Sequence, residues 1–250
     1  RSEVTLELKD VSIPTATGSR DLISHISFNL HAGEVVGIAG VEGNGQAELV
    51  EAIMGLRNYT GSIDFQGSSI DHMSVAHRHD LGIGLIPEDR QRQALMMDSP
   101  LWENRILGHQ RGKPVMRGFI LDRKATIEDT KRIMEEFDVR APGPMTAAAA
   151  LSGGNQQKFI VGREMSKAPA LLVASHPTRG VDVGAQGAIW EVLREARTKG
   201  MAIVLISADL EELIGMSDRL LVMLRGVITA ELDPQKTTPE QLGSAMTGAA

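Results

Sequence analysis

The chain has 250 residues, of which 42% are hydrophobic, 23% are charged and 3% are aromatic, and its formal net charge is −6. This length and balance suit one large folded domain and exclude a wholly disordered chain, while the acidic charge and the scarcity of aromatic side chains count against a nucleic-acid partner. The absence of cysteine excludes disulfides, thiolate metal sites and cysteine nucleophiles. No apolar run approaches the roughly 18 residues of a membrane span, so membrane association is expected to go through a partner protein.

The first predicted elements are two half-buried strands. Apolar and polar residues alternate over residues 5–8 and 26–30, which is typical of antiparallel strands with one face on the core. Further along, short continuous apolar runs alternate with helix-like stretches, which predicts a mostly parallel sheet covered on both faces. These runs are residues 35–39, 82–86, 171–174, 202–207 and 220–224, the last followed by a turn at 225–226 and a strand at 227–230.

The middle of the chain, residues 98–150, is dominated by helix formers. Apolar residues within 124–137 recur at helical spacing, at Ile127, Ile133, Met134 and Phe137, and the sequence Ala-Pro-Gly-Pro at 141–144 breaks the pattern. The chain is therefore predicted to be one α/β domain, residues 1–250, with an N-terminal antiparallel β subdomain and an inserted α-helical subdomain at about 98–150.

A glycine-rich loop between a predicted strand and a predicted helix is the first candidate binding site. Its sequence GVEGNGQA, residues 40–47, has the spacing GxxxxGK[ST] of a phosphate-binding loop. Gln46 stands where that motif has lysine, and Ala47 stands where it has a magnesium-binding hydroxyl. The backbone N–H groups that could turn toward a phosphate at the start of the helix belong to Gly40, Gly43, Asn44 and Gly45. Taken alone, the loop fits a degenerate phosphate site and an ordinary glycine-rich turn equally well.

The second candidate site is LSGGNQQK, residues 151–158, at the start of a helix predicted over 156–165. Ser152 is placed as a helix cap. Its hydroxyl, with the amides of Gly153, Gly154 and Asn155, forms a potential anion site at the positive end of the helix. A cap that binds nothing is the alternative.

Three strings together carry a resemblance: LSGGNQQK, GIGLIPEDR at residues 82–90 and HPTRGVDVGA at 176–185. The chain resembles the ATP-binding proteins of the simple-sugar and nucleoside importers of the ABC superfamily, and within them the second, C-terminal ATPase half. The resemblance extends from Val4 to about Gly248. It implies a P-loop NTPase core, ATP as the ligand, and head-to-tail pairing with an N-terminal catalytic half, so that each ATP lies between one half's phosphate loop and the other's signature.

The same resemblance implies further partners and a location. Membrane permease subunits would be direct partners, a substrate-binding protein an indirect one, and the chain would sit peripherally at the cytoplasmic face of the cell membrane. The predicted docking groove for the permease is lined by residues 88–104 and the helical subdomain.

Matched residue by residue, the resemblance predicts that the chain's own catalytic site is lost. Ser175 replaces the magnesium-binding aspartate, His176 the general-base glutamate and Ala208 the switch histidine. Glu88 replaces the Q-loop glutamine, whereas Asp182 keeps the D-loop aspartate. Residues 11–20 contain no aromatic side chain to stack on adenine.

These losses all fall on magnesium-dependent phosphoryl transfer, whereas the signature remains whole. The chain is therefore expected to bind ATP weakly at its own site, to use magnesium only together with the partner half, and to hydrolyse little or nothing alone. The alternatives are a soluble ABC-type ATPase, a fully active ATPase with unusual chemistry and a non-hydrolysing regulatory interaction module.

Some side chains have both a chemical and a plain interpretation. His176 could act as a base, but without a magnesium carboxylate a non-catalytic residue is the better interpretation. A tract of three histidines, His72, His77 and His79, suggests a metal site; lacking cysteine or carboxylate at ligand spacing, it is better explained as a solvated helix end before Gly82.

Two further features are equally ambiguous. Trp102 could face a membrane partner or pack in the core. The acidic run at residues 209–212 is explained more simply as the charged start of a helix than as a metal site.

Overall fold

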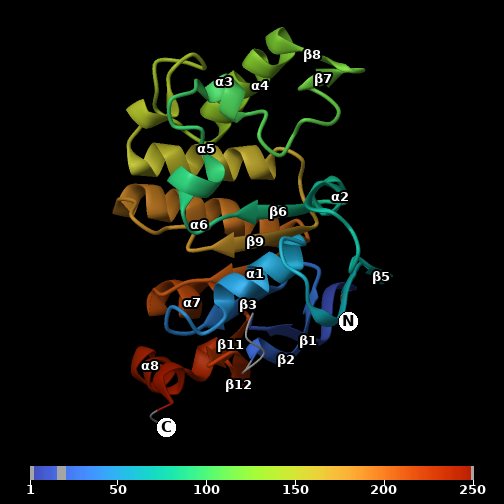
Figure 1. The fold of residues 1–250 in the computed structure, drawn as a ribbon. Coiled ribbons are helices and arrows are strands. Elements are labelled where there is room, and N and C mark those ends of the chain that lie inside the picture. Colours follow the sequence, from blue (N-terminus) through green and yellow to red (C-terminus); the bar gives the residue numbers. More distant parts are fainter. Residues whose placement is uncertain (1–2, 16–20, 249–250) are drawn as a thin grey trace. The chain divides into compact units, whose positions relative to one another are not determined.

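The structure is a computed structural model that describes residues 3–15 and 21–248 (Figure 1). The chain divides into two compact units. The first comprises Arg1–Leu85, Pro169–His176 and Leu193–Ala250, and the second comprises Ile86–Ala168 and Pro177–Val192. Helix α6 (Val183–Thr198) is shared between them.

The first unit contains a four-stranded antiparallel sheet. Its order is β2 (Asp21–His31), β1 (Val4–Pro14), β4 (Thr60–Phe65) and β5 (Ser68–Ser69). The two half-buried strands predicted near the start of the chain are β1 and β2, which pair antiparallel along their length. The sequence did not predict β4, which pairs with the other edge of β1.

A six-stranded sheet forms the centre of the same unit. Its order is β12 (Val227–Leu232), β11 (Arg219–Leu224), β3 (Val35–Ala39), β10 (Ala202–Ile206), β9 (Leu171–Ser175) and β6 (Ile83–Ile86). Strands β11, β3, β10 and β9 are parallel, and β12 is antiparallel to β11. Every residue of β3, β9 and β10 is buried, which is why these strands read as continuous apolar runs.

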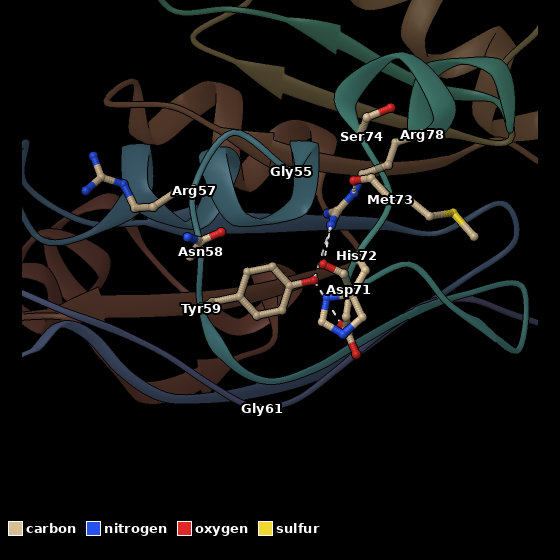
Figure 2. Close-up of a pocket in the computed structure, with 10 residues that line it drawn as sticks. All are labelled: Gly55, Arg57, Asn58, Tyr59, Gly61, Asp71, His72, Met73, Ser74 and Arg78. Carbon is tan, nitrogen blue, oxygen red and sulfur yellow. Dashed lines mark hydrogen bonds between the residues drawn. The ribbon is translucent and has the colours of Figure 1, made fainter.

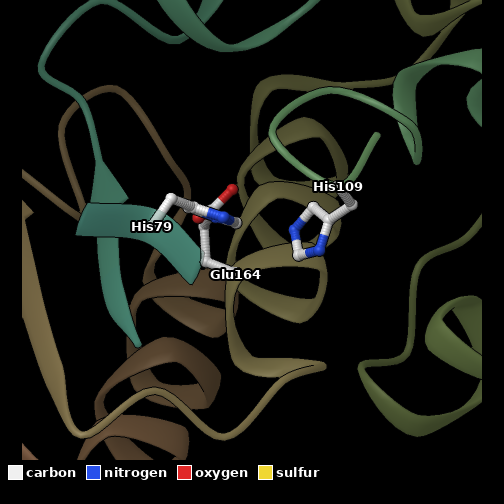
Figure 3. A group of neighbouring side chains, drawn as sticks. All are labelled: His79, His109 and Glu164. Atoms are coloured by element: carbon white, nitrogen blue, oxygen red, sulfur yellow. The ribbon is translucent and has the colours of Figure 1, made fainter. Parts of the chain in front are cut away.

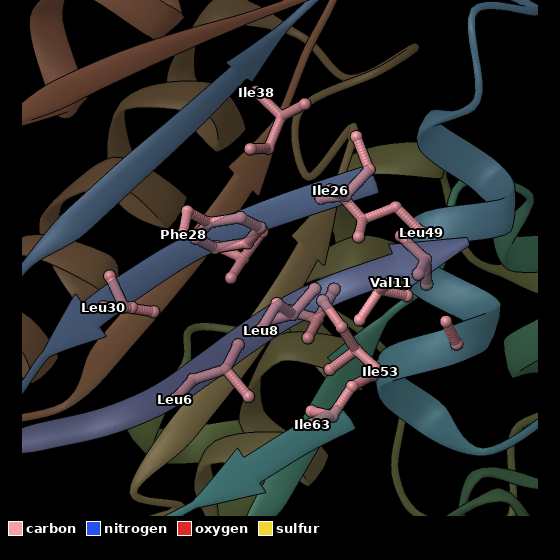
Figure 4. Close-up of a cluster of buried hydrophobic side chains, with 14 of the residues drawn as sticks. Leu6, Leu8, Val11, Ile26, Phe28, Leu30, Ile38, Leu49, Ile53 and Ile63 are labelled. Atoms are coloured by element: carbon pink, nitrogen blue, oxygen red, sulfur yellow. The ribbon is translucent and has the colours of Figure 1, made fainter. Parts of the chain in front are cut away.

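The hydrophobic core of this unit draws on both sheets and on helix α1 (Gln46–Met54). Figure 4 shows Leu8 and Ile26 of the antiparallel sheet, Ile38 of β3, and Leu49 and Ile53 of α1 within one cluster. The two α1 residues are four apart and so share one helix face. Helix α7 (Leu210–Met216) packs against β3 and α8 (Pro239–Thr247) against β11, while α2 (Val75–Asp80) precedes β6 and the short turn η3 (Pro234–Lys236) precedes α8.

The second unit is mainly helical. It contains a π-helical turn η1 (Arg90–Ala94), α3 (Leu101–Asn104), β7 (Met116–Arg117), β8 (Ile120–Leu121), α4 (Arg123–Glu136), η2 (Ala148–Ala150), α5 (Gly153–Met165) and the start of α6. The predicted helical stretch, residues 98–150, lies within this unit, and the predicted helix at 124–137 is α4. Ile127 and Phe137 are only half-buried, because Thr126 and Thr130 share the buried face with Ile133 and Met134.

Among the described residues, no helix is both long enough and apolar enough to cross a membrane.

Candidate functional site

The carboxyl ends of three parallel strands meet at one edge of the six-stranded sheet. Ile206, the last residue of β10, pairs with Ile38 of β3 on one side and with Ser175 of β9 on the other. The residues that follow these strands therefore reach the same edge, where parallel sheets bind their ligands. They are the glycine-rich loop at 40–47, His176 and Ala208.

Gln46 occupies the glycine-rich loop with its own side chain. The Gln46 amide Nε2 donates to the carbonyl oxygen of Val41 at 3.2 Å, and the residue is only 9% exposed. A Cβ atom added at Gly40 would overlap Gln46 Nε2, so the amide also lies against the end of β3. The side-chain amide of Asn44 donates to the same Val41 oxygen at 2.9 Å. Two neutral amides thus converge on one carbonyl of the loop.

Asn44 also ties this loop to the turn between β11 and β12. The backbone N–H of Arg225 donates to Asn44 Oδ1 at 2.7 Å, and the N–H of Gly226 donates to the Asn44 carbonyl at 2.9 Å. Gly43 and Gly45 have φ values of 87° and 108°, the left-handed backbone that the loop prediction requires. The loop is therefore held in shape by a distant turn, a contact with no signal in the sequence.

The positions expected to hold magnesium and activate water carry other groups. Ser175 is buried at the end of β9, and Ala47 and Ala208 are exposed. His176 has a φ of 49°, and its backbone N–H donates to the carbonyl of Ile206 at 2.7 Å. None of these four side chains is a carboxylate, the type of ligand that magnesium prefers in proteins.

The acidic run after β10 has a local role. Asp209 accepts from the backbone N–H groups of Glu211 at 2.9 Å and Glu212 at 3.1 Å, which caps α7. The interpretation as the charged start of a helix is confirmed.

The signature LSGGNQQK opens α5 in the second unit. Helix α5 begins at Gly153, three residues earlier than predicted, because Ser152 is its cap. Ser152 Oγ accepts from the backbone N–H of Asn155 at 3.4 Å and from its side-chain Nδ2 at 3.0 Å. Asn155 Oδ1 in turn accepts from the backbone N–H of Arg140 at 2.9 Å. The side chains at the two ends of this turn therefore hold the helix start in place.

The two signature glycines lie against the segment that leads into α6. A Cβ at Gly153 would stand 2.6 Å from Arg90 Nη2 and 3.0 Å from the Gly180 carbonyl oxygen. At Gly154 it would stand 2.9 Å from Asp182 Oδ2. Asp182 Oδ1 accepts from the N–H of Ala185 at 3.0 Å, and this backbone hydrogen bond lowers the pKa of the carboxyl group. Of the predicted residues, Gly154 and Asp182 are thus neighbours.

Arg90 connects the signature helix α5 to the segment before α6, a role that the sequence did not predict. Its guanidinium donates to the carbonyl oxygens of Arg179 at 2.6 Å and Gly180 at 3.1 Å, and to Gln156 Oε1 at 3.4 Å. Burial lowers the pKa of Arg90. Glu88, at the Q-loop position, forms an ion pair with Arg179. The only hint in the sequence was that Arg90 ends the string at residues 82–90.

A polar cavity of about 580 Å³ lies elsewhere in the first unit (Figure 2). Tyr59 donates its hydroxyl to Asp71 Oδ1 at 2.9 Å and accepts from Arg78 Nη2 at 3.3 Å. Arg78 is 1% exposed and donates to the carbonyl oxygens of Ala52, Ile53 and Ile70. The Arg78 guanidinium therefore provides hydrogen-bond donors for the last carbonyls of α1. Burial is the main reason that the pKa of the Tyr59 hydroxyl is raised to about 12.

The histidine tract runs from the turn before helix α2 into that helix. His72 and His77 are exposed, as a solvated helix end requires, but His79 is half-buried, so that interpretation was wrong for His79. The second unit buries two titratable side chains that no motif pointed to, His109 after α3 and Glu164 near the end of α5 (Figure 3). Glu164 accepts from Arg163 Nε at 3.0 Å.

Trp102 belongs to the core of the second unit. It is 9% exposed, and the guanidinium carbon of Arg123 lies 5.1 Å from the centre of its ring. The core interpretation is therefore confirmed. The segment without an aromatic for adenine, residues 11–20, includes positions 16–20, which lie outside the described residues.

Solved structures show the same fold. A nucleotide-free ATP-binding cassette from an ABC transporter superposes with a TM-score of 0.79 at 21% identity, covering 98% of this chain and 95% of that chain. An ATP-binding subunit of an ABC transporter gives 0.77 at 20% identity, covering 97% and 99%.

Curated proteins give a closer sequence match. The chain is 43% identical over 229 residues to the guanosine import ATP-binding protein NupO of Bacillus subtilis, covering 91% of this chain and 45% of that protein. It is 40% identical over 247 residues to the nucleoside import ATP-binding protein NupA of Lactococcus lactis, covering 98% and 49%. The ribose import ATP-binding protein RbsA 1 of Streptomyces avermitilis is 38% identical over 226 residues, covering 90% and 43%. The chain spans about half the length of the curated relatives it matches.

A family model described as ABC transporter matches residues 23–179, which include both the glycine-rich loop and the signature. With the fold and these identities, the match shows that the chain belongs to the ABC transporter family.

Proposed function

We propose that this chain is one ATP-binding half of an importer for nucleosides or simple sugars, and that it donates its signature to a composite ATP site while its own phosphate loop is degenerate. The observation that carries the proposal is the contrast between the two motifs. The loop is occupied by the neutral Gln46 amide, whereas Ser152 caps α5 and Gly154 lies against an intact Asp182.

The residues at the chain's own loop fit ATP poorly. Gln46 can donate a hydrogen bond but carries no positive charge, and Ala47 has no oxygen to offer magnesium. Ser175 and Ala208 supply neither the carboxylate nor the imidazole that the family's chemistry uses. Backbone amides alone therefore hold a nucleotide here, so binding is weak and hydrolysis is small or absent.

The residues at the signature fit a phosphate better. Ser152 Oγ accepts from Asn155 but keeps its own proton to donate. The first N–H groups of α5 have no partner within the helix and stand at its positive end. A phosphate presented by the loop of a facing half would meet one hydroxyl and these amides.

The remaining partners follow from the same proposal. The facing half is the catalytic ATPase domain that a longer polypeptide would supply, consistent with relatives about twice the length of this chain. Permease subunits would bind residues 88–104 and the surrounding helical region at the cytoplasmic face of the membrane, with a substrate-binding protein acting through them.

The test is a matched pair of substitutions at Ser152 in a transporter assembled with a catalytically complete half. Ser152→Asn and Ser152→Asp are nearly equal in size, and both side chains cap helices well. They differ by one negative charge at the point where the phosphate would dock. We expect Ser152→Asp to lower ATPase turnover by about ten-fold or more relative to Ser152→Asn, because it repels the phosphate. Equal turnover in the two variants would show that the signature does not meet a nucleotide.

The alternatives give different results with the isolated chain. A soluble ABC-type ATPase acting on nucleic acid would bind DNA or RNA at low salt. A pure interaction module would show no heat of ATP binding at any concentration.

A further inference from the structure

A short β-hairpin in the second unit carries an exposed apolar tip. Strands β7 and β8 pair through Met116 with Leu121 and Arg117 with Ile120, so two residues, Gly118 and Phe119, make the turn. Gly118 has a φ of 66°, the left-handed conformation that the first central position of a type II′ hairpin turn requires. Figure 1 shows the hairpin extending away from α5 of the same unit.

The base of the hairpin is fixed. Val115, just before β7, is 1% exposed, and the N–H of Asp122, just after β8, donates to the Val115 carbonyl at 2.9 Å. The Asp122 side chain accepts from the N–H of Ala125 at 2.9 Å and so caps α4. The orientation of the tip is therefore fixed by buried Val115 before β7 and by the helix cap Asp122 after β8.

The side chains at the tip are strongly exposed. Phe119 is 103% exposed, Ile120 is 75% and Leu121 is 39%. Folding leaves this apolar surface in water, and its shape is a convex point, not a groove. A contiguous exposed apolar feature of this kind marks an interaction site.

The chain segments on either side of the tip are basic, although the whole chain has a net charge of −6. Residues 109–124 contain one acidic side chain, that of Asp122, which is engaged in capping α4. The five basic residues of this stretch are all exposed, although the Arg123 guanidinium lies over the Trp102 ring; they are Arg111, Lys113, Arg117, Arg123 and Lys124.

We propose that the hairpin at residues 116–121, with the basic residues around it, binds the surface of an anionic lipid bilayer. The apolar tip enters the boundary between headgroups and acyl chains, and the Lys and Arg side chains remain at the level of the anionic headgroups. An exposed apolar tip flanked by basic residues matches an anionic bilayer, which offers apolar depth below a continuous negative surface. This inference does not depend on the state of the nucleotide site.

The test uses the full 250-residue chain and extruded vesicles. We expect co-sedimentation with phosphatidylcholine vesicles that contain about 30% phosphatidylglycerol and little with phosphatidylcholine alone. Binding should fall as sodium chloride rises from about 0.05 M to about 0.5 M, since salt screens the headgroup charge. In a Phe119→Trp variant, brominated lipid should quench more of the tryptophan fluorescence than it does in the parent chain, which contains only Trp102 and Trp190.

Two pairs of substitutions separate the contributions. Phe119→Ser with Ile120→Ser removes the apolar tip, and Lys113→Gln with Arg117→Gln removes two charges. Each pair should lower the vesicle partition coefficient by about ten-fold or more. The controls are Val183→Ser, an apolar side chain that is 84% exposed elsewhere, and Lys199→Gln with Lys236→Gln, two exposed cations outside the hairpin; these should change binding less than about two-fold.

Clear results would overturn the proposal. The proposal is wrong if the chain does not bind anionic vesicles at low salt. It is also wrong if the hairpin variants bind these vesicles as well as the parent chain does. If the folded hairpin variants instead lose only the capture of purified membrane subunits in detergent, the surface binds protein and the proposal is wrong. Thermal unfolding at an unchanged temperature verifies that each variant is folded.

Discussion

The side-chain amide of Gln46 donates to the carbonyl oxygen of Val41 at 3.2 Å, inside the loop that would cradle a phosphate. A nucleotide entering this loop must compete with that contact. It gains in return only hydrogen bonds to neutral groups, because the loop position that carries lysine in phosphate-binding loops is this same glutamine.

ATP binding to the isolated chain is therefore predicted to be weak and nearly independent of magnesium. The loss of one charge-assisted contact costs about 1.5–3 kcal/mol, which is about one to two decades in affinity. Calorimetric titration of the chain with ATP, in the presence of magnesium or of a chelator, measures both quantities. Sub-micromolar binding that requires magnesium would contradict the prediction.

Restoring the five replaced positions should rebuild a catalytic site. The changes are Gln46→Lys, Ala47→Ser, Ser175→Asp, His176→Glu and Ala208→His. Single changes should do little, because groups that act as a unit are strongly non-additive. The variant with all five changes should first gain magnesium-dependent ATP binding and then phosphate release that rises with protein concentration, because in the proposed function each site needs the signature of a facing copy.

The structure predicts that one of these five changes, His176→Glu, destabilises the folded chain. His176 has a φ of 49°, where histidine is tolerated better than glutamate. His176→Glu alone should therefore lower the free energy of unfolding by about 1 kcal/mol, measured by urea denaturation. If the variant with all five changes folds but neither binds nor hydrolyses ATP, the defect lies outside these positions. Residues 11–20, which contain no aromatic side chain, would then be the first segment to test.

Arg90 is predicted to hold the segment before α6 against the signature helix. Arg90→Ala removes the donors to the carbonyls of Arg179 and Gly180 and should lower the free energy of unfolding by about 1–3 kcal/mol. Amide hydrogen exchange should rise at residues 180–185. Arg92→Ala is the matched control, because its side chain is 88% exposed; an equal effect from both substitutions would remove the special role of Arg90.

The Tyr59 hydroxyl should lose its proton at a higher pH than an ordinary tyrosine hydroxyl does. Burial, the main cause, raises its pKa from 10.0 to about 12 in the folded chain. The protonated hydroxyl is favoured by folding, so its stabilising contribution is full below pH 10 and is lost as the pH rises from 10 toward 12. Tyr59 is the single tyrosine of the chain, so tyrosinate absorbance reports it alone. A folded-state midpoint near 10, the same as in urea, would contradict this environment.

The sequence was most informative where structure is local and periodic. The continuous apolar runs marked β3, β9 and β10 because all their residues are buried, and the spacing of apolar residues marked α4. It missed β7 and β8, since two residues per strand are too few to show alternation.

The site was predictable as a set of positions but not as a set of contacts. The string LSGGNQQK identified the start of α5, yet the contact of Arg90 with Gly180 joins residues 90 positions apart, and that of Asn44 with Arg225 joins residues 181 apart. Such pairs leave no periodic trace in a single sequence. They are decided by how the folded elements pack.

Asp122 ends the hairpin and begins α4, so no linker separates the two. Helix α4 in turn lies so close to α5 that a Cβ at Gly162 would stand 2.7 Å from both Ile133 and Phe137. The tip therefore joins α4 without a linker and α4 contacts α5, so we expect a displacement of Phe119 to be felt at α5, the helix that begins at the signature.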